Sequence, residues 1–114
     1  YLAPMTTAVR DQDVATPAAF RLGPAFPNPF NSSVAIPFAV ARAAVVSLSV
    51  YNLAGQRIAD LFSGRLAPGD HRVMWSGQDR HGHDMASGVY LVRLQTVQPP
   101  SGDLSLSSRL LLLR

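Results

Sequence analysis

The sequence predicts an all-β fold, an antiparallel β-sandwich of about seven strands. Short apolar segments alternate with polar residues at a period of two, and nine prolines and eight glycines separate them. No stretch of the chain has the apolar spacing of a convincing amphipathic helix. Because 47% of the 114 residues are hydrophobic and 15% are charged, we expect a packed core rather than disorder.

The chain divides into a short first part and one folded domain. Residues 1–19 show neither period and are rich in Thr, Ala, Pro and Asp. We interpret 1–19 as a linker or the remnant of an upstream domain, and 20–114 as the sandwich. The chain is therefore expected to be a piece of a longer protein that ends at Arg114.

A proline-rich stretch, PAFPNPF, opens the domain. Proline fixes φ and pushes the residue before it toward extended geometry, and Asn28 and Asn31 can form local Asx turns. We predict that residues 24–33, here called the lead-in, are rigid and pack Phe26 and Phe30 against the sandwich. A recognition peptide is the alternative. The residues that make up this structural motif are Pro27, Asn28, Pro29, Phe30 and Asn31.

Six strands follow from the alternation. They are expected at 34–40, 44–53, 56–62, 71–76, 89–97 and 104–114. Pro37 predicts an edge strand or a bulge at 34–40, and the broken period of 56–62 also indicates a bulge. Gly55 serves a turn that needs positive φ. Further turns are expected at 67–70, 77–88 and 98–103.

One face of each strand is expected in the core. The core-facing residues predicted from the alternation are Val46, Leu48, Val50, His71, Val73, Trp75, Tyr90, Val92 and Leu94. Trp75 could instead stack on a sugar ring, but it shares its parity with Val73, which favours the core.

The last strand has apolar residues of both parities. Leu104, Leu106, Leu110 and Leu112 share one face, whereas Leu111 and Leu113 take the other. A strand with one buried face needs only one apolar parity. The extra pair either docks on a partner, by strand addition, or is covered by the linker or an upstream domain.

Charge and composition exclude several classes of function. All ten basic residues are arginines, scattered along the chain, with a formal net charge of +3. Nucleic-acid binders cluster such charge, so we expect no nucleic-acid partner. There is no cysteine, which removes disulfides and thiolate metal sites. The longest apolar run is too short to cross a bilayer.

The stretch DRHGHD is the strongest candidate for site chemistry. Asp79, His81, His83 and Asp84 could approach a metal, but no distant ligand accompanies them. We predict a turn capped by Asp79 with Gly82, and no metal or other cofactor. A Ser-His-Asp catalytic triad could be drawn from Ser76, His71 and Asp70, but no G-x-S-x-G motif is present to support it. We expect neither catalysis nor a small-molecule substrate.

Four segments carry a family resemblance: FPNPFNSSVAIPFAV, VSLSVYNLAGQRIADL, LAPGDHRVMWSGQD and MASGVYLVRLQT, followed by an Arg- and Leu-rich strand. Together they resemble the C-terminal sorting domains of the bacterial type IX secretion system, which are similar to the Ig-like domain of the flagellar hook-capping protein. The resemblance covers residues 20–114 in order. It implies an Ig-like sandwich without catalytic activity.

The resemblance also implies a function. Such domains direct an upstream cargo across the periplasm and outer membrane to the cell surface. The translocon reads them, and a surface sorting peptidase removes them, here within 1–19. The residues expected to meet the translocon are Gly88, Tyr90, Arg93, Arg109, Leu111 and Leu113. Many members carry Lys where this chain has Arg109. Weak self-association through the terminal strand is also expected. The alternative function is a carbohydrate- or cell-wall-binding accessory module of a secreted hydrolase.

Overall fold

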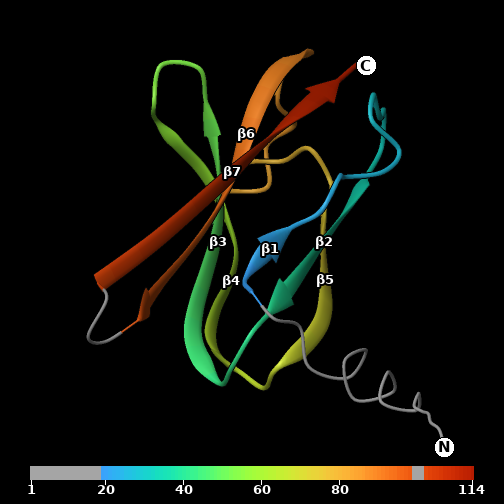
Figure 1. Ribbon diagram of the computed structural model, residues 1–114. Helices are drawn as coiled ribbons and strands as arrows, with labels where there is room; N and C mark the ends of the chain where they lie inside the picture. The colour runs from blue at the N-terminus through green and yellow to red at the C-terminus, as the bar shows by residue number, and fades with distance from the viewer. Residues whose placement is uncertain (1–18, 99–101) are drawn as a thin grey trace, which may run out of the picture.

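Seven strands form two facing antiparallel sheets (Figure 1). The computed structural model describes residues 19–98 and 102–114. The strands are β1 (Arg21–Leu22), β2 (Val34–Val40), β3 (Ala44–Asn52), β4 (Arg57–Leu66), β5 (Gly69–Trp75), β6 (Gly88–Gln98) and β7 (Gly102–Leu112). The predicted all-β sandwich is confirmed. The linker expected at 1–19 lies outside the described residues, apart from Ala19.

The two sheets have the orders β1-β2-β5 and β4-β3-β6-β7. Strand β7 is therefore an edge strand of the four-stranded sheet, next to β6. Over the described ranges, no helix is long and apolar enough to span a lipid bilayer.

The core lies between the sheets, and the predicted alternation largely fills it. Val46, Leu48 and Val50 of β3 are fully buried. Trp75 is 2% exposed, and its indole N–H donates to the Gln78 carbonyl oxygen at 2.8 Å. A buried indole needs such a partner, so the core position of Trp75 is confirmed. The other predicted core residues that are buried are Tyr90, Val92 and Leu94, while His71 and Val73 are partly exposed.

The prediction that 34–40 is an edge strand is wrong. Strand β2 is the middle strand of its sheet, and it pairs with β5 along its whole length. The Pro37 carbonyl oxygen still accepts a hydrogen bond from the Gly23 N–H. The one bond that proline cannot make is the return bond from its own nitrogen, and this would be the last bond of the two-residue β1 ladder. The missing N–H therefore falls where β1 ends. A strand as short as β1 leaves no pattern in the sequence.

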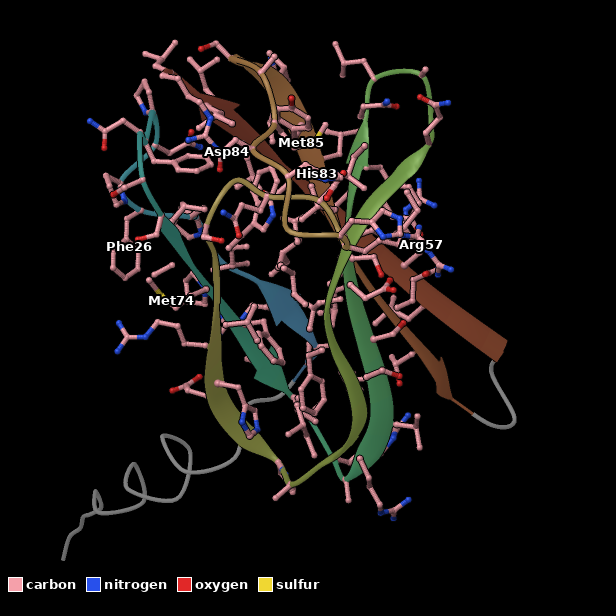
Figure 2. The ribbon with its side chains drawn as sticks, turned by 180° about the vertical axis from the view of Figure 1, so that it is seen from behind. Phe26, Arg57, Met74, His83, Asp84 and Met85 are labelled. Carbon is pink, nitrogen blue, oxygen red and sulfur yellow. The ribbon has the colours of Figure 1, made fainter. Side chains whose placement is uncertain are left out.

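The lead-in buries one of its two predicted aromatics. Phe30 is 3% exposed and packs edge-on against Trp75, with 5.7 Å between the ring centroids. Phe26 is 49% exposed, so that prediction is wrong. Phe26 pairs with Ala35, which pairs with Met74, and this row lies on the outer face of the three-stranded sheet (Figure 2). Pairing with an outward-facing position of β2 turned the ring away from the core.

The bulge predicted in the 56–62 strand is confirmed. The β3–β4 register shifts between Leu48 and Ser49 and again between Val50 and Tyr51. The strand runs on to Leu66, beyond the predicted end, because its second half continues to pair with β3. Gly55 adopts φ 87° in the preceding turn, as expected.

Adjacent leucines at the end of β7 test the core assignment. Leu112 is fully buried, whereas Leu113 is 50% exposed. We expect Leu112→Ala to lower the free energy of unfolding by about 2–5 kcal/mol through lost contacts and a cavity. Leu113→Ala should change it by less than about 0.5 kcal/mol. Urea denaturation measures both, and equal losses would contradict the assigned facing of β7.

Candidate functional site

The outer face of β6 and β7 carries the candidate site. Residues on this face alternate with the core residues of the same strands. Leu91 lies between Tyr51 of β3 and Arg109 of β7 in one cross-strand row. Arg93 occupies the next row, with its guanidinium carbon 4.7 Å from the centre of the Tyr51 ring. This cation–π contact orients Arg93 across the sheet.

Four side chains form what we call the outer-face patch: Leu91, Arg93, Arg109 and Leu111. Leu91, Arg93 and Leu111 are partly exposed and Arg109 is exposed. Val89 pairs with Leu111 and extends the apolar part of the patch. The patch thus combines apolar side chains with two guanidinium groups, on a rigid sheet rather than on a loop.

The six predicted translocon-contact residues do not lie together. Arg93, Arg109 and Leu111 share the outer face. Tyr90 has the opposite parity: it is 6% exposed, and its hydroxyl donates to the Ala86 carbonyl oxygen at 2.6 Å. A partner at the surface cannot contact this ring directly.

The two remaining residues lie at strand ends. Gly88 begins β6 opposite Leu112, and Leu113 follows the end of β7. Leu113 lines a shallow pocket with the lead-in. The other lining residues are Pro27, Pro29, Phe30 and Asn31. The peptide bonds before Pro27 and Pro29 are both cis.

Asn28 joins the lead-in to the edge of β7. Its side-chain N–H donates to the Arg109 carbonyl oxygen at 3.0 Å, and its side-chain oxygen accepts from the Leu111 N–H at 2.9 Å. Phe30 continues this pairing, since its N–H donates to the Leu111 carbonyl and its carbonyl accepts from the Leu113 N–H. The sequence predicted a local Asx turn at Asn28. Its observed partners are instead more than eighty residues away.

The predicted turn capped by Asp79 is confirmed. One carboxylate oxygen of Asp79 accepts the N–H groups of His81 and His83 at 2.8 and 2.9 Å. Gly82 takes φ 84° within this turn. The hydrogen bond from the His83 amide is the largest cause that holds the pKa of Asp79 below its ordinary value.

The acidic groups of this loop are already engaged. Asp84 accepts from the Gln78 side-chain N–H at 3.1 Å and lies 3.7 Å from an Arg114 nitrogen. Figure 2 shows His83 and Asp84 on this loop at one end of the sandwich. Across residues 19–98 and 102–114, no three His, Asp or Glu side chains gather as a metal site would require.

His71, one of the three residues considered as a catalytic triad, already has other partners. His71 stacks on Phe38, with 5.5 Å between the ring centroids, and its Nε2 lies 2.8 Å from the Ala67 carbonyl oxygen. Because a carbonyl accepts, Nε2 carries the proton. Its donor is therefore directed to the β4–β5 turn.

Sequence reasoning missed Arg114. Its side chain donates to the carbonyl oxygens of Met85 and Gly77 at 2.6 and 2.7 Å, and its main-chain N–H donates to the Ser87 hydroxyl. A Cβ at Gly77, where φ is 74°, would lie 2.7 Å from the guanidinium. Arg114 thus fastens the end of the chain to the 77–87 loop. No local pattern signals a contact between positions so far apart in the sequence.

Comparison with known proteins identifies the family. Residues 30–99, more than half of the chain, match the family model of the FlgD Ig-like domain. The chain belongs to the FlgD Ig-like domain family. No curated protein matches this FlgD Ig-like domain.

Solved structures share the fold of this FlgD Ig-like domain. Dimeric latent PorU from Porphyromonas gingivalis matches with a TM-score of 0.69 and 16% identity, over 83% of this chain and 9% of that one. FlgD from P. aeruginosa gives 0.57 and 24%, over 69% and 61% of the two chains. FlgD from Xanthomonas campestris gives 0.53 and 22%, over 86% and 64%. The domain spans less than two thirds of each of these proteins, and at such identities the likeness concerns the fold alone.

The contact between Asn28 and β7 can be tested by substitution. Asn28→Ala removes two hydrogen bonds, so we expect the free energy of unfolding to fall by roughly 1–2 kcal/mol. Asn31→Ala is the matched control, because Asn31 is exposed and makes no hydrogen bond to the described part of the chain. Denaturant unfolding measures both variants, and equal stabilities would refute the assigned role of Asn28.

The Asp79 turn predicts a pH dependence. In the unfolded chain the carboxyl has a pKa of about 3.9, and the folded value is lower. The charged Asp79 carboxylate therefore stabilises the fold fully at pH values above its pKa in the unfolded chain. This stabilisation is lost as the pH falls through its lower pKa in the folded domain. Asp79→Asn keeps an acceptor oxygen but loses the charge. The free energy of unfolding of this variant should be lower than that of the wild type at neutral pH, and the difference should shrink in that acidic window. Unfolding experiments at a series of pH values measure it. An NMR titration that gives Asp79 an ordinary pKa would contradict this.

Proposed function

We propose that this FlgD Ig-like domain is a C-terminal sorting domain that directs an upstream cargo through the type IX secretion system. The domain acts by being bound, without catalysis. The observation that carries the proposal is the outer-face patch. The last two strands expose two arginines and two leucines on one side, while their other side completes the core.

The chemistry of the patch suits recognition by a protein. Arginine is enriched where interfaces concentrate their binding energy, and apolar side chains beside it exclude water from its hydrogen bonds. Arg93 is already oriented by Tyr51, so it loses less side-chain freedom on binding. The partly exposed Leu91 and Leu111 supply the apolar area.

The position of Phe20 bears on the proposed removal of the domain. Phe20 is 8% exposed and belongs to the core cluster. A cut on its C-terminal side would take a core residue from the sandwich. We therefore propose that the surface peptidase cleaves within residues 1–19, and that the released domain stays folded.

The alternative carbohydrate-binding function depended on an exposed aromatic platform. Trp75 was its candidate, and that ring is 2% exposed.

Export of a reporter tests the proposal. We would fuse the 114-residue chain to the C-terminus of a periplasm-targeted reporter in a host with type IX secretion. The unchanged chain should bring the reporter to the cell surface or the medium. The pair Arg93→Gln and Arg109→Gln should reduce export several-fold, because it removes both charges of the outer-face patch.

The matched control places the same changes on the other sheet. Arg21→Gln and Arg72→Gln remove two exposed arginines from the three-stranded sheet, and this pair should export normally. Thermal unfolding of each purified domain confirms that the variants fold. If the unchanged chain leaves the reporter in the periplasm, or if both pairs export equally, the proposal fails.

Point substitutions are needed because truncation of the tail is uninformative. Removing residues 109–114 would take the fully buried Leu110 and Leu112 from the core. It would also remove the partners of Asn28 and Phe30. Loss of export would then follow from unfolding alone.

A further inference from the structure

The bulge of β4 forms one wall of a small pocket. In the β3–β4 register β4 advances from Arg57 to Ala59 where β3 advances by a single residue, so Ile58 is the extra residue. A bulge bends its strand and redirects the groups around it. Here the carbonyl oxygens of Arg57 and Ile58 both accept hydrogen bonds from Arg80. The 77–87 loop is thereby held against β4.

The pocket between the bulge and the loop has a volume of about 270 Å³. Its lining residues are Arg57, Ile58, Asp79, Arg80, His81 and Met85. Figure 2 shows Arg57 on β4 beside the loop that carries His83 and Met85. Ile58 and Met85 are partly buried and pack against the hydrophobic core. The lining therefore combines apolar side chains with cationic ones, in a space smaller than the roughly 300 Å³ at which pockets for drug-sized ligands begin.

Arg80 is held in place at two points. Its main-chain N–H donates to the Ile58 carbonyl oxygen at 3.0 Å, and its Nη2 donates to the Arg57 carbonyl oxygen at 3.1 Å. Among the described residues, the other N–H groups of its guanidinium have no partner. The main chain of β4 thus orients the guanidinium while most of its donors stay available to a ligand. Such pre-organisation lowers the cost of binding.

Arg57 supplies a second set of available donors. Its Nε lies 3.5 Å from a carboxylate oxygen of Asp60, and both side chains are 51% exposed. An exposed ion pair of this kind contributes little to stability. It leaves the two terminal nitrogens of Arg57 without a partner in the part of the chain that the structure describes.

Asp79 is the one acidic side chain among the lining residues, and its oxygens are already engaged. One oxygen accepts the main-chain N–H groups of His81 and His83, and the other lies 3.5 Å from Nδ1 of His83. These donors satisfy the carboxylate within its own turn. The two permanent guanidinium charges of the pocket therefore outnumber its single carboxylate, and the pocket favours an anion.

We propose that this pocket binds a phosphate monoester. A guanidinium group donates two parallel hydrogen bonds to phosphate oxygens, and a monoester carries about −1.5 to −2 charges at pH 7. That charge matches two arginines better than a carboxylate does. Ile58 and Met85 provide an apolar surface for the carbon skeleton of the ester. No residue of the outer-face patch lines this pocket, so the inference does not depend on the proposed function.

An NMR titration of the 114-residue chain with glucose 6-phosphate tests the proposal. The main-chain amide signals of His81 and Gly82 should shift and reach saturation. Glucose, which lacks the phosphate, should leave them unchanged. Arg57→Gln and Arg80→Gln should each weaken binding by at least about tenfold, because each removes charge-assisted hydrogen bonds to the ligand.

Arg65→Gln is the matched control. Arg65 is exposed on the same strand but does not line the pocket. Its loss lowers the net charge of the chain by the same amount, and screening at physiological salt should keep the change in affinity below about twofold. Thermal unfolding checks that each variant folds. If Arg80→Gln disturbs the loop, Arg57→Gln still tests the site, because the Arg57 side chain makes only an exposed ion pair.

Vesicle binding identifies the carrier of the phosphate. Phosphatidic acid in phosphatidylcholine vesicles presents a monoester on a lipid surface, whereas phosphatidylglycerol presents a diester. Binding to the phosphatidic acid vesicles that requires Arg57 and Arg80 would identify a lipid headgroup, and binding of glucose 6-phosphate alone would identify a soluble ester. The proposal is overturned if neither monoester binds, if both kinds of vesicle bind alike without a response to glucose 6-phosphate, or if Arg65→Gln weakens binding as much as the pocket variants.

Discussion

The pairing of the lead-in with β7 is the contact on which much of this domain depends. Asn28 and Phe30 bond to the last residues of the chain, so the beginning and the end of the sandwich are closed together. Phe30 also packs against Trp75 in the core. The contact therefore closes the sheet edge and also contributes to the core, so we expect removal of the final residues to unfold the domain.

The same contact divides β7 into two halves with different surroundings. Beside the lead-in, Leu110 and Leu112 are fully buried and the main chain is paired. From residue 103 to residue 108, no described residue forms a main-chain hydrogen bond on the side away from β6, and Leu104 and Leu106 are only partly buried. One strand thus has a half that the lead-in closes and a half that the lead-in does not reach. Neither half obstructs the outer-face patch, because the side chains of the patch project perpendicular to the sheet rather than along its edge.

The alternation of apolar and polar residues predicted where most strands lie, but it did not predict which way every side chain faces. Val46, Leu48 and Val50 were assigned correctly, because a period of two relates neighbours within one strand. The same reasoning places Tyr90 in the core, so the translocon contacts expected at Tyr90 and Arg93 fall on opposite faces. A family resemblance names positions along the chain, whereas parity determines which of them reach the surface.

The sequence alone determined the all-β class, most strand positions, the bulge of β4 and the Asp79 turn, because these depend on neighbours within a few residues. Tertiary structure decided the exposure of Phe26, the central place of β2 despite Pro37, and the distant partners of Asn28 and Arg114. These features depend on which strands meet across the sandwich. Pairing between segments eighty residues apart leaves no local pattern, since the contacts form only when the two sheets close on each other.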